Sequence, residues 1–327
     1  MCVLITGCNG FIGYHLAKKC LSKNIQCVGI DNNNDYYDLN LKIDRNKSLK
    51  SLGNFDFHKA DLNDNKKISE IIKKYDVTKI VHLAAQAGVR YSVDNPHAYI
   101  ESNINGFFNI INTAKNNNIE HFIYASSSSV YGNSCKMPFK ETDNTNKPLS
   151  MYAATKKSNE LIAHSYANIH GLKSTGLRFF TVYGPWGRPD MAYYKFTDAI
   201  YNNLAMTVFN KGNMRRDFTY IDDVIAGIMS AILKDTDDNQ YFDTSIPHRV
   251  FNLGNNVPVK LKKFINIIED RLEKKAIIDY QPMQLGDVES TFADVSQAMQ
   301  HLDYKPSTEI ELGLNNFIDW YLEYKSR

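Results

Sequence analysis

The chain has 327 residues, of which 43% are apolar, and its 38 basic and 36 acidic residues leave a net charge of only +2. This length exceeds one typical domain, so we expect a larger domain joined to a smaller lobe. The near-neutral charge argues against nucleic acid or an anionic membrane surface as a partner. No apolar run approaches the roughly 18 residues of a membrane span, and the first residues leave no room for a signal peptide.

Cysteine and histidine usage favours a reducing compartment and no metal. The cysteines are odd in number and show no CxxC spacing; they are Cys2, Cys8, Cys20, Cys27 and Cys135. Free thiols in a reducing cytoplasm fit this pattern best. The nine histidines form no HExxH or paired ligand spacing, so we predict no metal site.

The chain opens with a pattern typical of strand, tight turn and helix. An apolar run at residues 3–5 is followed by spaced glycines and then by a helical pattern of apolar residues. Gly7 can take a conformation closed to other residues, Gly10 lets backbone N–H groups approach a pyrophosphate, and Gly13 permits close helix packing. The residues predicted to bind a cofactor here are Gly7, Gly10, Phe11, Ile12 and Gly13.

A carboxylate follows at the distance that a dinucleotide site requires. The apolar run 27–30 ends in Asp31, about where an acidic residue binds the adenosine ribose. Because Asp31 would repel a 2′-phosphate, the sequence favours NAD over NADP. The alternative is a cluster of turn glycines followed by a solvated aspartate.

Strand-like and helical segments alternate through the first half of the chain. The strand-like runs are residues 55–58, 79–83, 121–124 and 174–178, and the helical stretches are 66–75, 98–116 and 152–169. This alternation predicts an α/β protein with a Rossmann-type, doubly wound, parallel sheet.

The regular alternation of strands and helices ends after about residue 180. Loops rich in proline and glycine follow, and we read them as the start of a smaller α/β substrate-binding lobe on the C-terminal side. We therefore expect residues 1–180 to form the NAD-binding domain and residues 181–327 mainly to bind the substrate. The run 249–253 is predicted to return to the main sheet as a strand.

Tyr152 and Lys156 are four residues apart in a predicted helix, so their side chains share one face. An ammonium beside a phenol favours the phenolate, and a tyrosine with an ordinary pKa near ~10 could then accept a proton at neutral pH. Lowering that pKa by about 3 units takes roughly 4 kcal/mol. The lysine and a positively charged nicotinamide ring could supply this jointly.

The order of these motifs resembles the extended short-chain dehydrogenase/reductase family from end to end. The series continues with a serine run before residues 130–132 and ends at the Tyr152–Lys156 pair. Longer stretches are similar to nucleotide-sugar 4-epimerases, and among these to UDP-glucuronate 4-epimerases; they are residues 35–38, 88–92, 126–132, 177–191 and 216–223. The resemblance implies a tightly bound NAD, with further cofactor contacts from Asn32, Asp61, Leu62, Leu83, Ala84 and Ala85.

The resemblance also implies a mechanism. Tyr152 would remove the proton from the sugar 4-hydroxyl while NAD takes hydride from C4, giving a 4-keto sugar that turns over before hydride returns to its opposite face. Lys156 would lower the tyrosine pKa, and Ser127 would hold the reacting hydroxyl. Family 4,6-dehydratases carry an acid pair where this chain has Ser128 and Ser129, and glucuronate decarboxylases carry a glutamate at the latter position. Neither elimination nor decarboxylation therefore has its expected helper here.

Arg216 and Arg90 are candidate contacts for a nucleotide sugar. Arg216 suits a diphosphate, because a guanidinium matches paired phosphate oxygens. A salt bridge from Arg216 to a nearby aspartate, Asp222 or Asp223, is the alternative. Arg90 could orient sugar or cofactor, although a structural role is equally open.

A C6 carboxylate calls for a cation and hydroxyl donors. Arg188 and Thr181 could provide them together with Ser128 or Ser129. Hexose epimerases usually have asparagine at the Thr181 position, which argues against a neutral C6 group. The alternative for Arg188 is a loop arginine that pairs with Asp190 or reaches a phosphate.

The leading hypothesis is a cytoplasmic, NAD-retaining isomerase of UDP-glucuronate and UDP-galacturonate. A second is a 4-epimerase of UDP-glucose, UDP-N-acetylglucosamine or a UDP-N-acetylated uronate. A third is a non-catalytic NAD-binding regulator, against which the intact Ser127, Tyr152 and Lys156 count. Helices at 103–114 and 152–166 resemble those of a dimer interface in relatives, so we expect a homodimer, although these apolar stripes could instead face the sheet.

Overall fold

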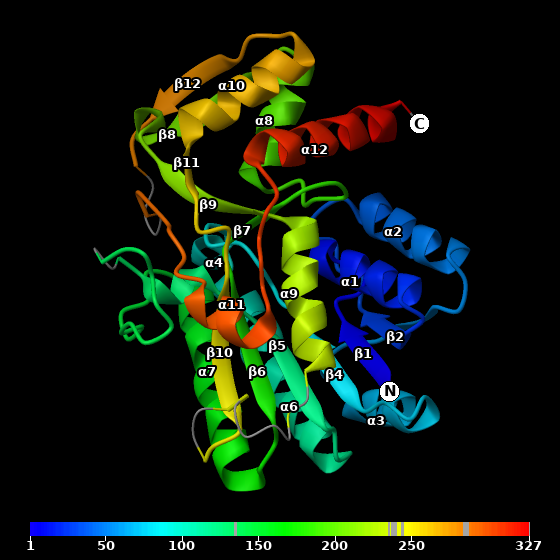
Figure 1. Cartoon of the computed structure of the whole chain (residues 1–327). Helices are drawn as coiled ribbons and strands as arrows, with labels where there is room; N and C mark the ends of the chain where they lie inside the picture. The colour runs from blue at the N-terminus through cyan, green and yellow to red at the C-terminus, as the bar shows by residue number, and fades with distance from the viewer. Residues whose placement is uncertain (134–135, 235, 237–240, 243–244, 284–287, 327) are drawn as a thin grey trace.

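The structure is a computed structural model that describes residues 1–133, 136–234, 236, 241–242, 245–283 and 288–326. Its larger part is built on a seven-stranded sheet in which every pair of neighbours is parallel (Figure 1). In spatial order the strands are β10 (His248–Leu253), β6 (Ser174–Phe179), β5 (His121–Ser127), β4 (Lys79–His82), β1 (Cys2–Thr6), β2 (Gln26–Asp31) and β3 (Asp56–Lys59). The predicted doubly wound sheet is confirmed, and β10 is the returning strand.

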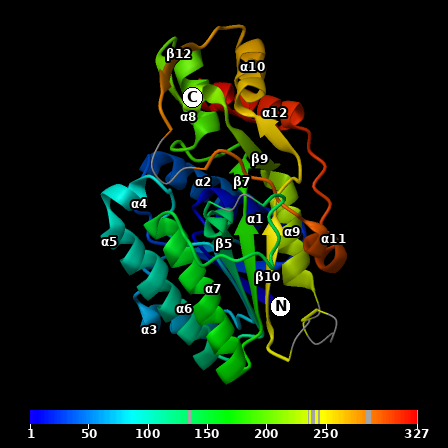
Figure 2. The ribbon, with the colours of Figure 1, turned by 90° about the vertical axis from the view of Figure 1, so that its left-hand side faces the viewer.

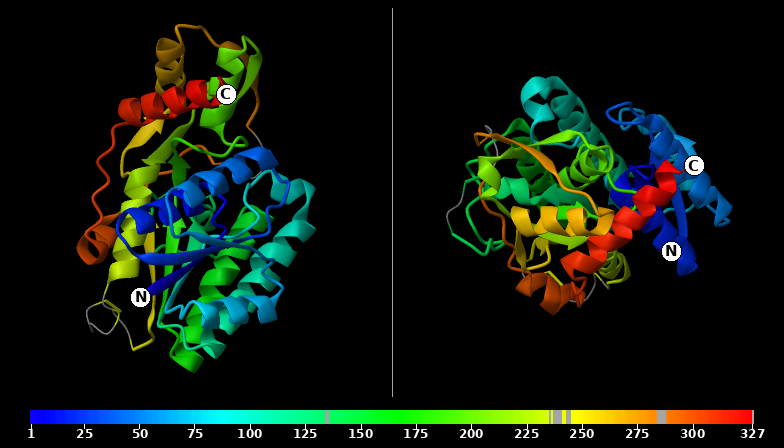
Figure 3. Two further views of the ribbon diagram at one scale, coloured as in Figure 1. Left: turned by 90° about the vertical axis from the view of Figure 1, so that its right-hand side faces the viewer. Right: turned by 90° about the horizontal axis from the view of Figure 1, so that it is seen from above.

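Helices cover both faces of this sheet, which is why β1 is buried at every position. One face is covered by α1 (Phe11–Ser22), α2 (Leu39–Ser51), α9 (Ile221–Leu233) and α11 (Ser296–Leu302) (Figure 3). The other is covered by α3 (Asn65–Lys74), α6 (Gly106–Asn116) and α7 (Met151–His170) (Figure 2). Because α9 follows the break at residue 180 but packs on α1, the two parts of the chain are not divided at a single point.

The helix α7 has clear chemical signals at both ends. The Ser150 hydroxyl accepts a hydrogen bond from the backbone N–H of Ala153 at 3.1 Å and so caps the first turn. At the other end Gly171 has φ +65°, a left-handed conformation that glycine adopts without strain. These signals place Tyr152 in the first turn of α7 and Lys156 in the second.

The helix expected at 98–116 is interrupted in the structure. A short α4 (Tyr91–Asp94) and α5 (Pro96–Tyr99) lead into a π-helical turn, η1 (Ile100–Asn105), and only then does α6 begin. Such turns are uncommon and often lie at functional sites. Apolar periodicity does not reveal them, because one wider turn barely changes the pattern.

The smaller part of the molecule lies beyond the carboxyl ends of the large sheet (Figures 1 and 2). Its strands form a three-stranded sheet of β7 (Thr181–Tyr183), β9 (Arg215–Tyr220) and β11 (Pro258–Lys260), and a pair of β8 (Ala205–Phe209) and β12 (Ile277–Gln281). Its helices are α8 (Ala192–Tyr201), α10 (Leu261–Leu272), α12 (Ile310–Lys325) and the short turn η3 (Asn210–Gly212).

Three expectations drawn from composition can be compared with the described residues. None of the helices there has both the length and the apolar character needed to cross a bilayer. Within the same ranges, no three His, Cys, Asp or Glu side chains gather in a way that could hold a metal ion. Four cysteines are buried free thiols, namely Cys2, Cys8, Cys20 and Cys27, whereas Cys135 lies outside the described residues.

Candidate active site

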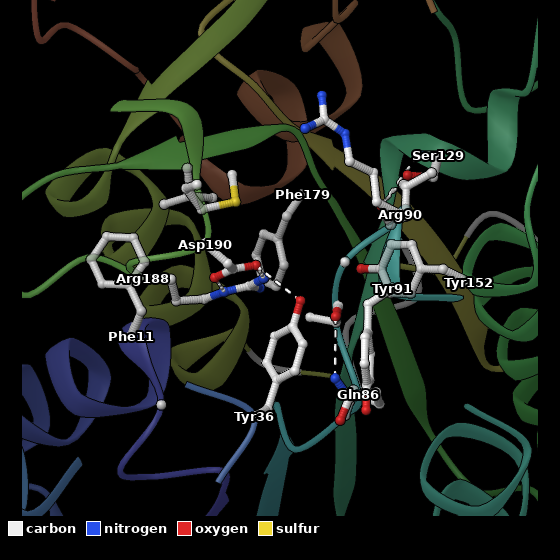
Figure 4. Close-up of a pocket in the computed structure, with 18 of the residues that line it drawn as sticks. Phe11, Tyr36, Gln86, Arg90, Tyr91, Ser129, Tyr152, Phe179, Arg188 and Asp190 are labelled. Atoms are coloured by element: carbon white, nitrogen blue, oxygen red, sulfur yellow. Dashed lines mark hydrogen bonds and ion pairs between the residues drawn. The ribbon is translucent and has the colours of Figure 1, made fainter. Parts of the chain in front are cut away.

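A cavity of about 1310 Å³ lies between the carboxyl ends of the large sheet and the smaller lobe. This exceeds the roughly 300–1,000 Å³ of a site for one small molecule and suits a dinucleotide with a second ligand. Every residue that the sequence predicted for catalysis, cofactor or substrate lines it. Figure 4 shows several of them, with Tyr152 on one side of the cavity and Phe11 and Arg188 on the other.

The glycine turn between β1 and α1 forms one end of the cavity. Gly7 has φ +70° and donates its N–H to the Ile30 carbonyl at 2.8 Å. A Cβ on Gly13 would lie 2.1 Å from the Gly7 carbonyl oxygen, so the helix can approach the turn only with glycine there. No side chain caps α1 at Gly10, which leaves the first-turn N–H groups free of a side-chain acceptor. This geometry fits a bound pyrophosphate.

Two aspartates lie where an adenosine would be bound. The Asp31 carboxylate at the end of β2 accepts hydrogen bonds from the backbone N–H of Asn9 at 3.1 Å and of Asn33 at 2.8 Å, which fixes its orientation. The Asp61 carboxylate accepts from the Asn32 amide at 3.0 Å. Partial burial raises the pKa of Asp61, but bonds from Asn32 and Asn63 outweigh it and hold this pKa below its ordinary value. Both carboxylates are therefore held in fixed orientations as hydrogen-bond acceptors, which suits the hydroxyl groups of an adenosine ribose.

Tyr152, Ser127 and Lys156 come together at the centre of the cavity. Tyr152 and Lys156 come from α7 and Ser127 from the end of β5, and the Ser127 hydroxyl acts on the Tyr152 phenol by lowering its pKa. The Lys156 ammonium donates to the Ala125 carbonyl at 2.8 Å. Burial lowers the pKa of Lys156 to about 8.

The electrostatics of Tyr152 differ from the sequence-based expectation. Burial raises the pKa of Tyr152, and the groups that act against this shift are the Ser127 hydroxyl and the charge of Arg188. The sequence had assigned that task to Lys156 and the cofactor. Since Arg188 belongs to a loop of the smaller lobe, its charge at the phenol could not be read from local spacing.

The serine run continues from β5 into a short 3-10 turn, η2 (Ser128–Tyr131). The Ser127 hydroxyl donates to the Ser129 hydroxyl at 3.1 Å and accepts from the Ser129 N–H at 3.2 Å. Ser128 and Ser129 both line the cavity and bring no carboxylate to it. The turn offers adaptable hydroxyl groups in place of a general acid or base.

Arg188 pairs with Asp190, which the sequence had left open as an alternative to substrate binding. Its Nε donates to Asp190 Oδ1 at 3.0 Å, and its Nη2 donates to the other carboxylate oxygen. The Tyr36 hydroxyl also donates to Asp190, at 3.2 Å. All three side chains lie together in the cavity wall (Figure 4). Tyr36 and Asp190 were not predicted as site residues.

The remaining predicted substrate residues lie toward the smaller lobe. The Arg216 guanidinium donates from Nη1 to the carbonyl oxygens of Arg215 and Glu289, at 3.0 Å each. The Arg90 guanidinium lies 4.6 Å from the centre of the Phe209 ring. Thr181 begins β7 and is paired in register with Phe218 of β9.

Sequence reasoning missed the polar contacts around the π-helical turn. The Asn103 side chain accepts from the Gln86 N–H at 2.8 Å and donates to the Gln86 carbonyl at 2.9 Å and the Thr155 hydroxyl at 3.1 Å. Asn103 thereby joins the loop after β4, which lines the cavity, to the helix that carries Tyr152. The sequence held one signal of this role: Asn103 occupies a position that the apolar helical pattern predicts to be buried, and a buried amide needs hydrogen-bond partners.

Comparison with known proteins agrees with this geometry. The family model described as GDP-mannose 4,6-dehydratase matches residues 4–317. The chain belongs to this family of extended short-chain dehydrogenases/reductases. Among curated members of the family, Protein CapI of Staphylococcus aureus is 50% identical over 99% of both chains. UDP-glucuronate 4-epimerase 4 of Arabidopsis thaliana is 45% identical over 99% of this chain and 76% of its own.

A solved structure from the same family resembles the fold throughout. The UDP-glucuronic acid 4-epimerase of Bacillus cereus, in complex with UDP-glucuronic acid and NAD, superposes with a TM-score of 0.90. It is 31% identical and is covered over its whole length, together with 99% of this chain. The likeness therefore includes the smaller lobe as well as the large sheet.

Proposed function

We propose that this family member interconverts UDP-glucuronate and UDP-galacturonate. It is an NAD-dependent nucleotide-sugar 4-epimerase, and the uronate is the substrate that its cavity suits best. One observation carries the proposal: Tyr152 and Ser127 share their cavity with two uncharged serines and with Arg188 on the opposite wall, and there is no acid at Ser128 or Ser129. Such a site can move a proton at a hydroxyl and bind a carboxylate, but it lacks the groups for elimination.

The chain's own residues have distinct tasks in this proposal. Tyr152 takes the proton from the sugar 4-hydroxyl and later returns it, while Ser127 holds that hydroxyl by a hydrogen bond. Lys156, one helical turn after Tyr152, is held in position by its hydrogen bond to the Ala125 carbonyl. Bound NAD supplies the hydride acceptor and donor at C4. Because the same hydrogen is removed and returned, no external oxidant is needed.

The two parts of the chain divide the binding. Residues 1–180, with the returning strand β10, hold NAD through the glycine turn, Asp31 and Asp61. Residues 181–327 hold the nucleotide sugar, with Arg216 toward the diphosphate and Thr181 and Arg188 toward the carboxylate. The diphosphate can then stay bound while the sugar turns over among the small serine side chains.

We also propose that the protein is a homodimer. Apolar side chains on α6 and α7 remain exposed, with Phe108 48% exposed, Leu161 60% and Ile169 68%. Since these helices already bury their other side against the sheet, the exposed side is free to pack on a second copy. Analytical ultracentrifugation of wild type and Leu161→Glu tests this: wild type should be dimeric and the variant monomeric, and a monomeric wild type would contradict it.

The substrate is tested by direct product analysis. The purified protein is incubated separately with UDP-glucuronate, UDP-glucose and UDP-N-acetylglucosamine, and products are identified by NMR. We expect UDP-galacturonate from the first and little conversion of the other two. Faster turnover of either neutral sugar, or release of a UDP-pentose at a rate comparable with epimerisation, would refute the uronate assignment.

A further inference from the structure

Behind the reacting groups lies a buried ion pair that has no part in the mechanism above. Glu160 of α7 is 4% exposed and Arg178 of β6 is 3% exposed. The pairing is bidentate, with Arg178 Nε 2.8 Å from Glu160 Oε1 and Nη2 2.9 Å from Oε2. Replacing such a pair by apolar residues is often neutral for stability, so stability alone does not account for it.

Glu160 connects the catalytic helix to the strand that ends in Ser127. It lies one turn after Lys156, on the same face of α7. Its Oε1 accepts a hydrogen bond from the Ser126 hydroxyl at 2.7 Å, and Ser126 is the register partner of Arg178 across β5 and β6. The pair is therefore bonded to the residue immediately before Ser127.

Arg178 holds the other end of the same segment. Its Nη1 donates to the Tyr131 hydroxyl at 2.9 Å, and its guanidinium lies 4.9 Å from the centre of the Tyr131 ring. Tyr131 is the last residue of the turn that carries Ser128 and Ser129, and its hydroxyl donates to Asn252 of β10 at 2.6 Å. Both ends of the segment 126–131 are thus bonded to one ion pair, whose carboxylate belongs to α7 and whose guanidinium belongs to β6.

We propose that the Glu160–Arg178 pair sets the position of the Ser127 hydroxyl relative to the Tyr152 phenol. Glu160 and Arg178 are then positioning residues for the proton transfer, and this inference rests on the proposed function in which Tyr152 is the proton acceptor. The bond from Lys156 to Ala125 ties α7 to β5 at one more point. The hydrogen bonds to Ala125, Ser126 and Tyr131 together hold α7 and the serine turn in fixed positions. A displacement of about 1 Å between reacting groups lowers a reaction rate strongly.

Glu160→Gln is the first test, since it keeps the size of the side chain and removes the charge that pairs with Nε and Nη2 of Arg178. We expect kcat to fall by about 10- to 100-fold with KM unchanged. The Ser127 hydroxyl lowers the pKa of Tyr152. Displacing that hydroxyl should therefore move the Tyr152 titration to higher pH. The titration is followed by NMR of tyrosine labelled with ¹³C at Cζ in the NAD-loaded protein, with Tyr152→Phe identifying the signal.

A paired substitution separates position from stability. Glu160→Leu combined with Arg178→Met removes both charges, so thermal stability should recover toward wild type. Because the bonds to Ser126 and Tyr131 are still missing, kcat and the Tyr152 titration should remain altered. Recovery of kcat together with stability would overturn the proposal.

Two milder variants decide the question if Glu160→Gln fails to fold. Ser126→Ala and Tyr131→Phe each keep the ion pair and remove one of its bonds to the serine segment. Each should lower kcat by a smaller factor and shift the Tyr152 titration in the same direction. The matched control is Asp223→Asn, a buried carboxylate that accepts from the N–H groups of Ser307 and Thr308, and it should lower thermal stability alone.

The outcome for substrate and the outcome for positioning can be told apart. If wild type converts a nucleotide sugar other than UDP-glucuronate, the substrate assignment fails and the variants are compared with that sugar. If wild type converts none, the proposed function fails and the Tyr152 titration alone decides on positioning. A folded Glu160→Gln protein with the wild-type Tyr152 titration overturns the positioning role in every case.

Discussion

Arg188 enters the cavity with its guanidinium already paired to the carboxylate of Asp190. The Nε–Oδ1 distance is 3.0 Å, and Nη2 bonds the second oxygen of the same carboxylate, so Nη1 is the nitrogen outside the pair. The pairing fixes the plane of the guanidinium. Asp190 also accepts a hydrogen bond from the Tyr36 hydroxyl, which joins this loop to the part of the chain that binds NAD. A fixed cation across the cavity from Tyr152 can both favour the phenolate and recognise an anionic sugar.

Arg188→Ala should therefore penalise an anionic sugar more than a neutral one. We expect kcat/KM for UDP-glucuronate to fall about 30-fold, equivalent to about 2 kcal/mol for a charge-assisted hydrogen bond. Steady-state kinetics with UDP-glucuronate and UDP-glucose measure the difference. Arg215→Ala, which removes an exposed arginine near the cavity, is the control. Equal losses for both sugars would exclude the carboxylate assignment.

Removing the Tyr152 hydroxyl should abolish turnover and leave NAD bound, because the glycine turn and Asp31 lie elsewhere in the cavity. Loss of the proton acceptor is expected to cost at least about 100-fold in kcat. Product formation is followed by NMR, and cofactor content by chromatography after denaturation. Tyr166→Phe on the same helix removes a hydroxyl that donates to Asn112 at 3.3 Å, and it should keep full activity. A Tyr152→Phe enzyme of wild-type activity would end the mechanism.

The pH dependence of kcat follows from two buried groups. Burial raises the pKa of Tyr152, so the rate should increase with pH as the phenol loses its proton. Burial lowers the pKa of Lys156 to about 8, so Lys156 has already lost its charge in the pH range where the Tyr152 phenol of the free protein ionises. Ser127→Ala removes a group that lowers the Tyr152 pKa, and the rising limb should move to higher pH. An unshifted limb would mean that Ser127 does not act on the phenol.

Cofactor choice should depend on the charge of Asp31. Asp31→Asn keeps an acceptor for one of the two N–H groups, those of Asn9 and Asn33, and removes the repulsion toward a 2′-phosphate. We expect the preference for NAD over NADP to shrink by about tenfold, or ~1.4 kcal/mol. Isothermal titration calorimetry on protein freed of cofactor measures both affinities. An unchanged preference would assign the discrimination to other residues.

The glycine turn should tolerate no methyl group at Gly13. A Cβ there would lie 2.1 Å from the Gly7 carbonyl oxygen and 2.9 Å from the Cys8 Cα, both of which are backbone atoms. Gly13→Ala is expected to lose NAD and part of its thermal stability. Gly171→Ala is the control, since nothing lies within 4 Å of its Cβ, and its left-handed φ should cost only about 1 kcal/mol. Equal behaviour of the two variants would contradict a close approach at the turn.

Short-range chemistry allowed much of the fold and the list of site residues to be read from the sequence. The glycine turn, the buried run of β1 and the four-residue spacing of Tyr152 and Lys156 depend on steric limits and periodicity within a few residues. The order of strands and helices restricted the sheet to a doubly wound arrangement. Motif resemblance then supplied the candidate residues, and these line one cavity.

Tertiary structure alone decided how those residues act on one another. The Asn103 contacts at the π-helical turn, the bond from Tyr36 to Asp190 and the ion pair between Glu160 and Arg178 join separate elements of the fold. Such pairings depend on how whole helices and strands pack, and no local pattern records that packing. The sequence by itself determined which chemical groups are present and on which elements they lie. Packing determined which cation faces the phenol and what holds the serine turn beside it, because burial and distance set the pKa and the geometry of every group there.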